Sequence, residues 1–136
     1  MRHLLLLLFI LLALRASDIT WQSDYAAAQQ RAQQNGKKIF VMISTPECTW
    51  CRKLEATTLS DPTIIERLEK EYASVHVTRD VDAYPKELEA VVTPMCYFLA
   101  ADGTVIDYAR GYWGTDDFNL ILSDVNKRLT KMKEQE

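Results

Sequence analysis

The chain has 136 residues, a length typical of a single domain. Its 16 basic and 19 acidic residues leave a formal net charge of −3, and lysine and arginine form no cluster. A mildly acidic chain without a basic patch is poorly suited to nucleic acid, so we expect no nucleic-acid partner.

The first sixteen residues are typical of a secretory signal peptide. Met1-Arg2-His3 gives a basic start, an apolar run covers 4–12, and small residues follow at Ala16-Ser17. We expect cleavage after Ala16, which leaves a mature domain over 17–136. An uncleaved membrane anchor is the alternative. An exported chain meets an oxidising compartment, in which paired cysteines form disulfides.

Hydrophobic periodicity and breaker residues divide the rest of the chain into alternating helices and strands. Ser23 is the expected cap of the first helix, Ser60 or Asp61 that of the helix containing Pro62, and Thr115 that of the last. The first predicted elements are a helix over 24–34, a strand over 39–43, a helix ending near residue 59, a helix from residue 62 and a strand over 75–78. They are followed by a short helix over 85–92, strands over 95–99 and 105–108, and a final helix whose polar tail frays over 131–136.

The order of these elements indicates the fold class. Helices alternate with the first strands, which requires crossover connections, and Asp102-Gly103 is a hairpin signal between the last two strands. All five residues of 39–43 are apolar, as in a strand buried on both faces. We therefore predict an α/β fold, a three-layer α/β/α sandwich with a central mixed sheet.

Two of the three cysteines, Cys48 and Cys51, lie between the apolar strand over 39–43 and a helix-compatible segment. This spacing at a strand-to-helix junction suits a dithiol that cycles through a disulfide. If Cys48 lies at the helix N-terminus, unpaired N–H groups and the helix dipole favour its thiolate. The thiolate is the attacking species in disulfide exchange, so we assign Cys48 as the nucleophile and Cys51 as the resolving thiol.

Metal binding is the main alternative for this cysteine pair. A zinc site usually has four ligands, and the other candidates in the mature region are Cys96 and His76. Cu(I) accepts soft thiolates in low coordination, so a copper or zinc carrier using Cys48, Cys51 and Cys96 stays open. A purely structural disulfide is less favoured, because so short a loop removes little entropy from the unfolded chain.

With these motifs in this order, the chain resembles exported bacterial proteins of the thioredoxin-related family. The resemblance rests on the strand before Cys48-Thr49-Trp50-Cys51, on Thr93-Pro94 before a strand, on the Asp102-Gly103 hairpin and on Gly111-Tyr112 before the last helix. It covers nearly the whole mature chain.

The resemblance implies roles for three further residues. Pro94 is expected in the cis form beside the cysteine pair, and Thr93 is expected to offer its backbone to an extended substrate segment. Trp50 is expected at the rim of the site, where an aromatic side chain grips apolar substrate surface. A ring folded back over the domain is the alternative for Trp50.

Three residues depart from the family pattern or remain to be explained. Met42 stands where thioredoxins bury a carboxylate, six residues before the first cysteine. His76, in the neighbouring strand, would compensate as a proton shuttle if it lay beneath the cysteine pair. We favour the simpler interpretation, a sheet histidine satisfied by a neighbour. Cys96 is interpreted as a small buried hydrophobe, with a third reactive or metal-binding thiol as the alternative.

Together these observations predict a periplasmic thiol–disulfide oxidoreductase that acts on disulfide- or thiol-containing exported proteins. We expect it to be a monomer without a cofactor and to act as a reductase, because no histidine lies between Cys48 and Cys51 to stabilise the thiolate strongly. A reductase outside the cytoplasm needs electrons, so a membrane electron donor is expected.

Overall fold

The computed structural model describes residues 18–136. The predicted signal peptide over 1–16 and its cleavage site lie outside these residues. Within the described range, every helix is too short or too polar to cross a membrane.

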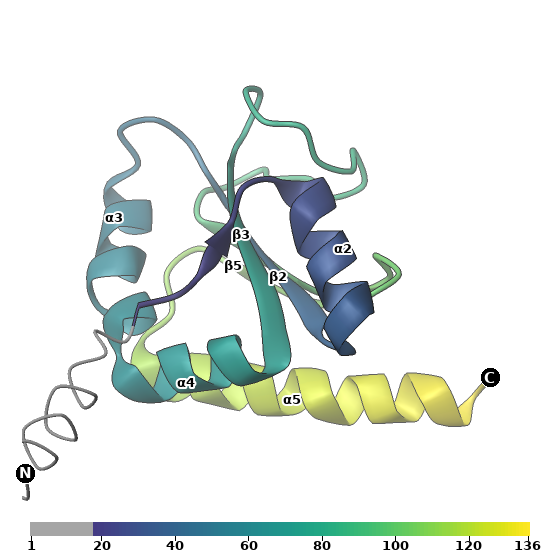
Figure 1. Ribbon diagram of the computed structural model, residues 1–136. Helices are drawn as coiled ribbons and strands as arrows, with labels where there is room; N and C mark the ends of the chain where they lie inside the picture. Colours follow the sequence, from purple (N-terminus) through teal and green to yellow (C-terminus); the bar gives the residue numbers. More distant parts are fainter. Residues whose placement is uncertain (1–17) are drawn as a thin grey trace, which may run out of the picture.

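The described chain forms a five-stranded mixed sheet flanked by helices (Figure 1). The strand order is β1-β3-β2-β4-β5, with β1, β3 and β2 parallel and β4 and β5 antiparallel to their neighbours. The strands are β1 (Trp21–Gln22), β2 (Lys38–Ser44), β3 (Tyr72–Thr78), β4 (Met95–Leu99) and β5 (Val105–Arg110). The helices are α2 (Tyr25–Asn35), α3 (Thr49–Ala56), the short 3₁₀ helix η1 (Thr58–Ser60), α4 (Pro62–Glu71) and α5 (Thr115–Glu134).

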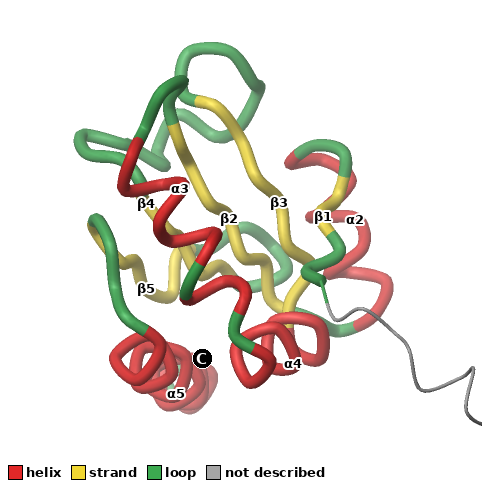
Figure 2. The backbone as a smooth tube through the Cα atoms, turned by 90° about the vertical axis from the view of Figure 1, so that its left-hand side faces the viewer, coloured by secondary structure: helices red, strands yellow, loops and turns green. Residues whose placement is uncertain are grey.

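The helices lie on both faces of this sheet, which confirms the predicted three-layer sandwich. In Figures 1 and 2, α2 covers one face, and α3, α4 and α5 lie on the other. Successive residues of a strand point to opposite faces, so β2 feeds both cores. Val41 joins the core beneath α2, whereas Phe40 and Met42 join the core beneath α3 and α5. In the latter core the Phe40 ring stacks on Phe98 with centroids 5.5 Å apart.

Helix ends differ from the predictions by small amounts that local hydrogen bonds explain. Asp24, rather than Ser23, caps α2, because its carboxylate accepts from the Ala27 N–H at 2.8 Å. Asp61 caps α4, as predicted, and accepts from the Thr63 N–H at 2.9 Å. The last helix begins at Thr115 without a side-chain cap and runs to Glu134, so most of the tail predicted to fray is helical.

The predicted short helix over 85–92 is wrong. Residues 79–94 form turns and bends without a helix, and Val91 and Val92 are exposed rather than turned inward. Leu88 is buried, as expected, and anchors the segment. Two carbonyl groups of residues 85–92 accept hydrogen bonds from side chains outside that range: Tyr97 Oη donates to the Glu89 carbonyl at 2.5 Å, and Arg79 Nη1 donates to the Ala90 carbonyl at 2.7 Å. An eight-residue helix has little stability of its own, so such contacts decide the backbone path.

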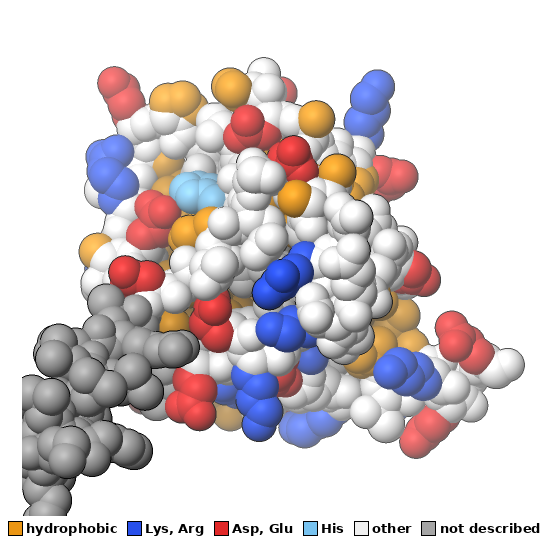
Figure 3. Space-filling model, in the orientation of Figure 1, with side chains coloured by type: hydrophobic (Ala, Val, Ile, Leu, Met, Phe, Trp, Pro, Cys, Tyr) orange, Lys and Arg blue, Asp and Glu red, His pale blue; other side chains and the backbone are white. Residues whose placement is uncertain are grey.

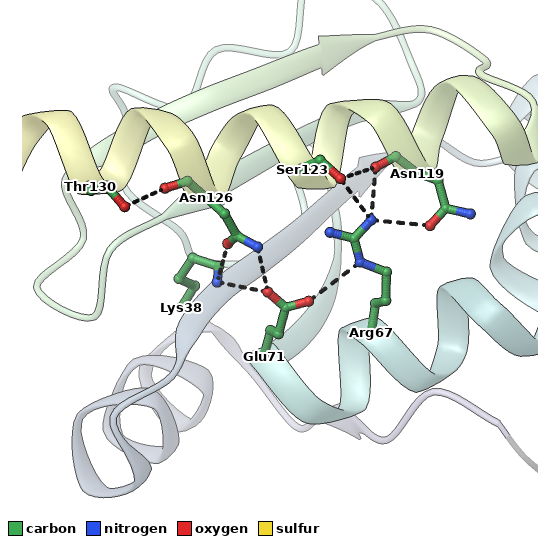
Figure 4. A network of polar contacts seen from close by, with 7 residues as sticks. All are labelled: Lys38, Arg67, Glu71, Asn119, Ser123, Asn126 and Thr130. Carbon is green, nitrogen blue, oxygen red and sulfur yellow. Dashed lines mark hydrogen bonds and ion pairs between the residues drawn. The ribbon is translucent and has the colours of Figure 1, made fainter.

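A polar network joins the first residue of β2 to α4 and α5 (Figure 4). Glu71 lies at its centre and accepts from Asn126 Nδ2 at 2.8 Å, from Lys38 Nζ at 3.4 Å and from Arg67 Nε at 3.5 Å. Arg67 also donates to the Asn119 carbonyl of α5 at 2.8 Å. The network therefore fixes the two helices against the end of the sheet that lies away from the cysteine pair.

Candidate active site

The cysteine pair lies beyond the carboxyl end of β2, where parallel strands commonly place functional groups. Residues 45–48 lead from this strand into α3, which packs on one face of the sheet (Figures 1 and 2). Thr45 Oγ1 lies 2.9 Å from Thr93 Oγ1, so the segment before the cysteines is joined directly to the segment before Pro94. The tertiary structure thus brings together two motifs that are more than 40 residues apart in the sequence.

Cys48 occupies the N-cap position of α3 and forms a disulfide with Cys51. Its sulfur accepts a hydrogen bond from the Cys51 N–H at 3.2 Å, which is the contact expected of a sulfur at a helix N-terminus. Cys48 is partly exposed, whereas Cys51 is 3% exposed. Cys48 is therefore the more accessible of the two cysteines, and the helix begins at Thr49, early enough for the Cys51 N–H to point at the Cys48 sulfur.

The Thr93-Pro94 peptide bond is cis, as the family resemblance implied. Pro94 is buried, and its carbonyl accepts from the Gly111 N–H at 2.8 Å, which ties this loop to the segment before α5. Thr93 is partly buried and contacts Thr45. The substrate-binding roles assigned to Thr93 and Pro94 stay predictions.

Trp50 is 55% exposed and lies at the rim of the site. Its ring also contacts two side chains of the domain, Tyr112 and Lys53. Its centroid is 5.7 Å from that of Tyr112, and Lys53 Nζ lies 4.9 Å from both rings. The Tyr112 hydroxyl lies 3.1 Å from Thr57 Oγ1, and this hydrogen bond lowers the pKa of Tyr112. Sequence reasoning did not place Lys53 or Tyr112 against Trp50. The three-residue spacing of Trp50 and Lys53 on one helix is a local signal for their contact, whereas no local pattern indicates the approach of Tyr112.

Met42 and His76 lie side by side on the face of the sheet that α3 covers. Met42 is fully buried in the same core as Cys51, and its Cα pairs in register with that of His76. His76 Nε2 lies 2.6 Å from Ser44 Oγ, and His76 Nδ1 lies 3.3 Å from Glu55 Oε1. Both ring nitrogens of His76 therefore have neighbours, as the simpler interpretation requires, and its role in proton transfer stays a hypothesis. Sequence reasoning missed that one neighbour, Glu55, belongs to the helix of the cysteines.

Cys96 is a free, fully buried thiol in β4. Burial raises its pKa to about 12, because a thiolate would be poorly solvated there. Its packing therefore agrees with the predicted role of a small hydrophobe. Among residues 18–136, no three His, Cys, Asp or Glu side chains are grouped so as to hold a metal ion.

Comparison with solved structures shows a shared fold. The chain is similar to a thioredoxin from Thermus thermophilus, with a TM-score of 0.69 and 22% identity over 79% of this chain and 87% of that one. It is similar to a structure described as DsbH oxidoreductase, with a TM-score of 0.66 and 19% identity over 84% and 89% of the two chains. A putative disulphide-isomerase from Bacteroides thetaiotaomicron gives a TM-score of 0.68 and 18% identity over 85% and 96%.

Comparison with curated protein sequences gave no match. Residues 25–126, by contrast, match the family described as thioredoxin-like domain. This match covers most of the chain and includes both cysteines, Trp50, Thr93 and Pro94. The chain therefore belongs to the thioredoxin-like domain family.

Proposed function

We propose that the protein is a thiol–disulfide oxidoreductase that uses Cys48 and Cys51. The observation that carries the proposal is the placement of Cys48, partly exposed at the N-cap of α3, in a disulfide with the buried Cys51. A helix N-terminus favours a thiolate, and a shielded second thiol three residues later is suited to closing an intramolecular disulfide. Membership of the thioredoxin-like family supports the same activity.

In the reductive direction, the Cys48 thiolate attacks one sulfur of a disulfide in a partner protein. A Cys48–partner bond forms, the partner's own S–S bond breaks, and its second sulfur leaves as a thiolate that takes up a proton. Cys51 then loses its proton and attacks Cys48, which releases the partner as a second thiol. The protein is left with the Cys48–Cys51 disulfide seen in the structure.

Two surfaces beside Cys48 are suited to a protein substrate. The backbone at Thr93, joined to the cysteine loop through Thr45, offers strand-like hydrogen bonds that need no particular substrate side chain. Trp50, held by Tyr112 and Lys53, offers an aromatic face for apolar side chains near the substrate disulfide. The expected partners are therefore disulfide- or thiol-containing proteins.

We place this activity outside the cytoplasm, in the periplasm, with a monomeric protein that receives electrons from a membrane donor. The apolar N-terminal run over 4–12 supports export. Solved structures of a periplasmic thioredoxin from Paracoccus pantotrophus and of a DsbD C-terminal domain share the fold. We propose reduction as the direction, with a potential nearer the thioredoxin value of about −270 mV than the strong-oxidant value of about −120 mV.

Insulin reduction, together with metal analysis of anaerobically purified protein, tests the proposal. The expected result is catalysed reduction that is lost in C48A and C51A and retained in C96A, a control that removes the buried third cysteine. Glutathione titration then measures the potential. A protein that fails to reduce insulin and is purified with stoichiometric copper or zinc on its cysteines would establish the metal-carrier alternative instead.

A further inference from the structure

Three side chains from three different elements form a hydrogen-bonded chain under the cysteine helix. Glu55 comes from α3, His76 from β3 and Ser44 from the last position of β2. The ring of His76 lies between the other two, with Nδ1 3.3 Å from Glu55 Oε1 and Nε2 2.6 Å from Ser44 Oγ. Trp21 of β1 covers the ring, with centroids 5.6 Å apart. Both ring nitrogens therefore have partners.

This chain lies next to the resolving cysteine. Glu55 follows Cys51 by four residues, so the two side chains lie on the same face of α3, one turn apart. His76 pairs in register with Met42, which packs in the same core as Cys51. Met42 is apolar, so it supplies no proton acceptor to that core. The His76 and Glu55 side chains are 30% and 40% exposed, so water reaches them.

The geometry suits the uptake and release of one proton. When the imidazole is neutral, Nδ1–H donates to the Glu55 carboxylate and Nε2 accepts from the Ser44 hydroxyl. When Nε2 is protonated, it donates to Ser44, whose hydroxyl turns to act as the acceptor, and Glu55 pairs with the cation. Neither state leaves a ring nitrogen unpaired. Imidazole is also the side chain that ordinarily changes charge between pH 5 and 8.

Other acidic groups face the same ring and belong to its electrostatic surroundings. Asp24, at the start of α2, and Asp82, after β3, line a hollow of about 190 Å³ together with His76. Each carboxylate accepts a backbone N–H: Asp24 from Ala27 at 2.8 Å and Asp82 from Thr78 at 2.7 Å. Asp18 and Glu55 line a second hollow beside Trp21. Figure 3 shows acidic side chains around the histidine at the surface, and Glu55 is the one paired with it.

We propose that Glu55, His76 and Ser44 form the proton relay for Cys51. The proposal rests on the thiol–disulfide activity proposed above and assigns its proton step. In the closing reaction, the Cys51 thiol gives its proton through water to His76, the Cys51 sulfur bonds to Cys48, and the Cys48–partner bond breaks. The electron pair leaves with the partner sulfur, which takes the proton from His76 and departs as a thiol. His76 and Glu55 act through water and are positioning residues rather than groups that touch the sulfur.

A two-phase reaction separates this step from the first attack. The reduced protein is mixed with an aromatic disulfide that releases a coloured thiolate. The first thiolate reports attack by Cys48, and the second reports closure by Cys51. We expect E55Q and H76Q to slow the second phase by about tenfold or more near neutral pH, in line with the loss of general base catalysis. The first phase should change much less, and the pH dependence of the second should lose the ionisation due to the relay.

E66Q is the matched control, because Glu66 is an exposed glutamate on α4; both of its phases should equal those of the wild type. Added imidazole should restore the second phase in H76A in a concentration-dependent way, which a purely structural role would not produce.

E55Q, changed at a half-exposed helix position, keeps the test valid if the His76 variants unfold. Equal second phases and pH profiles in E55Q and the wild type would overturn the relay alone. Absence of any coloured product from the wild type would instead refute the proposed function.

Discussion

The two ends of β2 carry charged groups in different settings. At its first residue, Lys38 enters the network around Glu71, where the side chains of this ion pair are only 13% and 22% exposed. At its last residue, Ser44 joins His76 and Glu55, of which the latter two are 30% and 40% exposed. The first cluster ties two helices to the sheet, whereas the second lies open to water beside the cysteines. We call the end at Lys38 the structural end of β2 and the end at Ser44 the reactive end. The two ends differ in how far water reaches their charged side chains.

At the structural end, the directions of the pKa shifts of Lys38 and Glu71 show which charged group the network stabilises. Burial lowers the pKa of Lys38 and outweighs the opposing effect of Glu71, because the ammonium is poorly solvated there. Burial alone would raise the pKa of Glu71, but the Asn126 hydrogen bond and the charges of Lys38 and Arg67 lower it overall. The two partners differ because Glu71 has three donors. The network therefore favours the carboxylate more than it favours the lysine.

The largest effects should follow from removing either reactive thiol. C51A should retain Cys48 and accumulate mixed disulfides with partner proteins, because no second thiol releases them. C48A should lose turnover and trap none. Electrophoresis without reductant, followed by mass spectrometry of the linked peptide, measures this. Trapping by C48A instead would reverse the two assignments. Thermal unfolding of both reduced variants should stay close to that of the reduced wild type.

At the other end of β2, E71Q should lower the free energy of unfolding by about 2 kcal/mol without changing turnover. The substitution keeps the size of the side chain but leaves the half-buried Lys38 and Arg67 with a neutral partner. Glu71 has a lowered folded-state pKa, so its contribution is present above the ordinary glutamate pKa of about 4.3. That contribution is lost as the pH falls through the folded-state value.

Urea unfolding at several pH values checks this prediction. The stability difference between wild type and E71Q should be greatest near neutral pH and shrink below about pH 4. E66Q, on the same helix, is the matched control and should unfold like the wild type. A difference that persists unchanged in acid would show that the Glu71 charge is not the source of the stability.

At the reactive end, W50A should raise the KM for a protein disulfide about fivefold and leave kcat nearly unchanged, because the exposed ring contributes apolar contact rather than chemistry. L120A is a suitable control, since Leu120 is a similarly exposed apolar residue on α5. Steady-state kinetics with insulin or a disulfide peptide gives the answer. An unchanged KM in W50A would remove Trp50 from the substrate surface.

The smallest expected effects concern Glu47, which precedes Cys48 with φ at +60°. This conformation is unfavourable for a residue with a side chain, and the carboxylate places a negative charge beside the reactive sulfur. E47Q should speed alkylation of Cys48 about twofold at neutral pH. E47G removes the same charge and also relieves the backbone, so it should be more stable than E47Q by about 1 kcal/mol. Equal stability of the two variants would argue against strain at this position.

The sequence carried enough information for the predicted α/β class, the succession of β2 to β5 along the chain and the candidate dithiol. Each depended on a local signal: five apolar residues over 39–43, two cysteines three apart at a helix start, and an Asp102-Gly103 hairpin turn. The segment over 79–94 was predicted less well. There, a plausible helical pattern over 85–92 gave way to contacts from Tyr97 and Arg79, which lie outside that pattern.

What the sequence determined by itself is therefore the succession of elements from α2 to α5 apart from the segment over 79–94, the covalent spacing of Cys48 and Cys51 and the absence of a carboxylate at Met42. The tertiary structure decided which side chains approach the dithiol. Glu55, His76 and Ser44 lie far apart in the sequence, and each alone is an ordinary polar residue. They meet because α3 folds back across β2 and β3, and because the parallel register places His76 beside Met42. Such register and packing depend on the whole sheet, which no local pattern specifies.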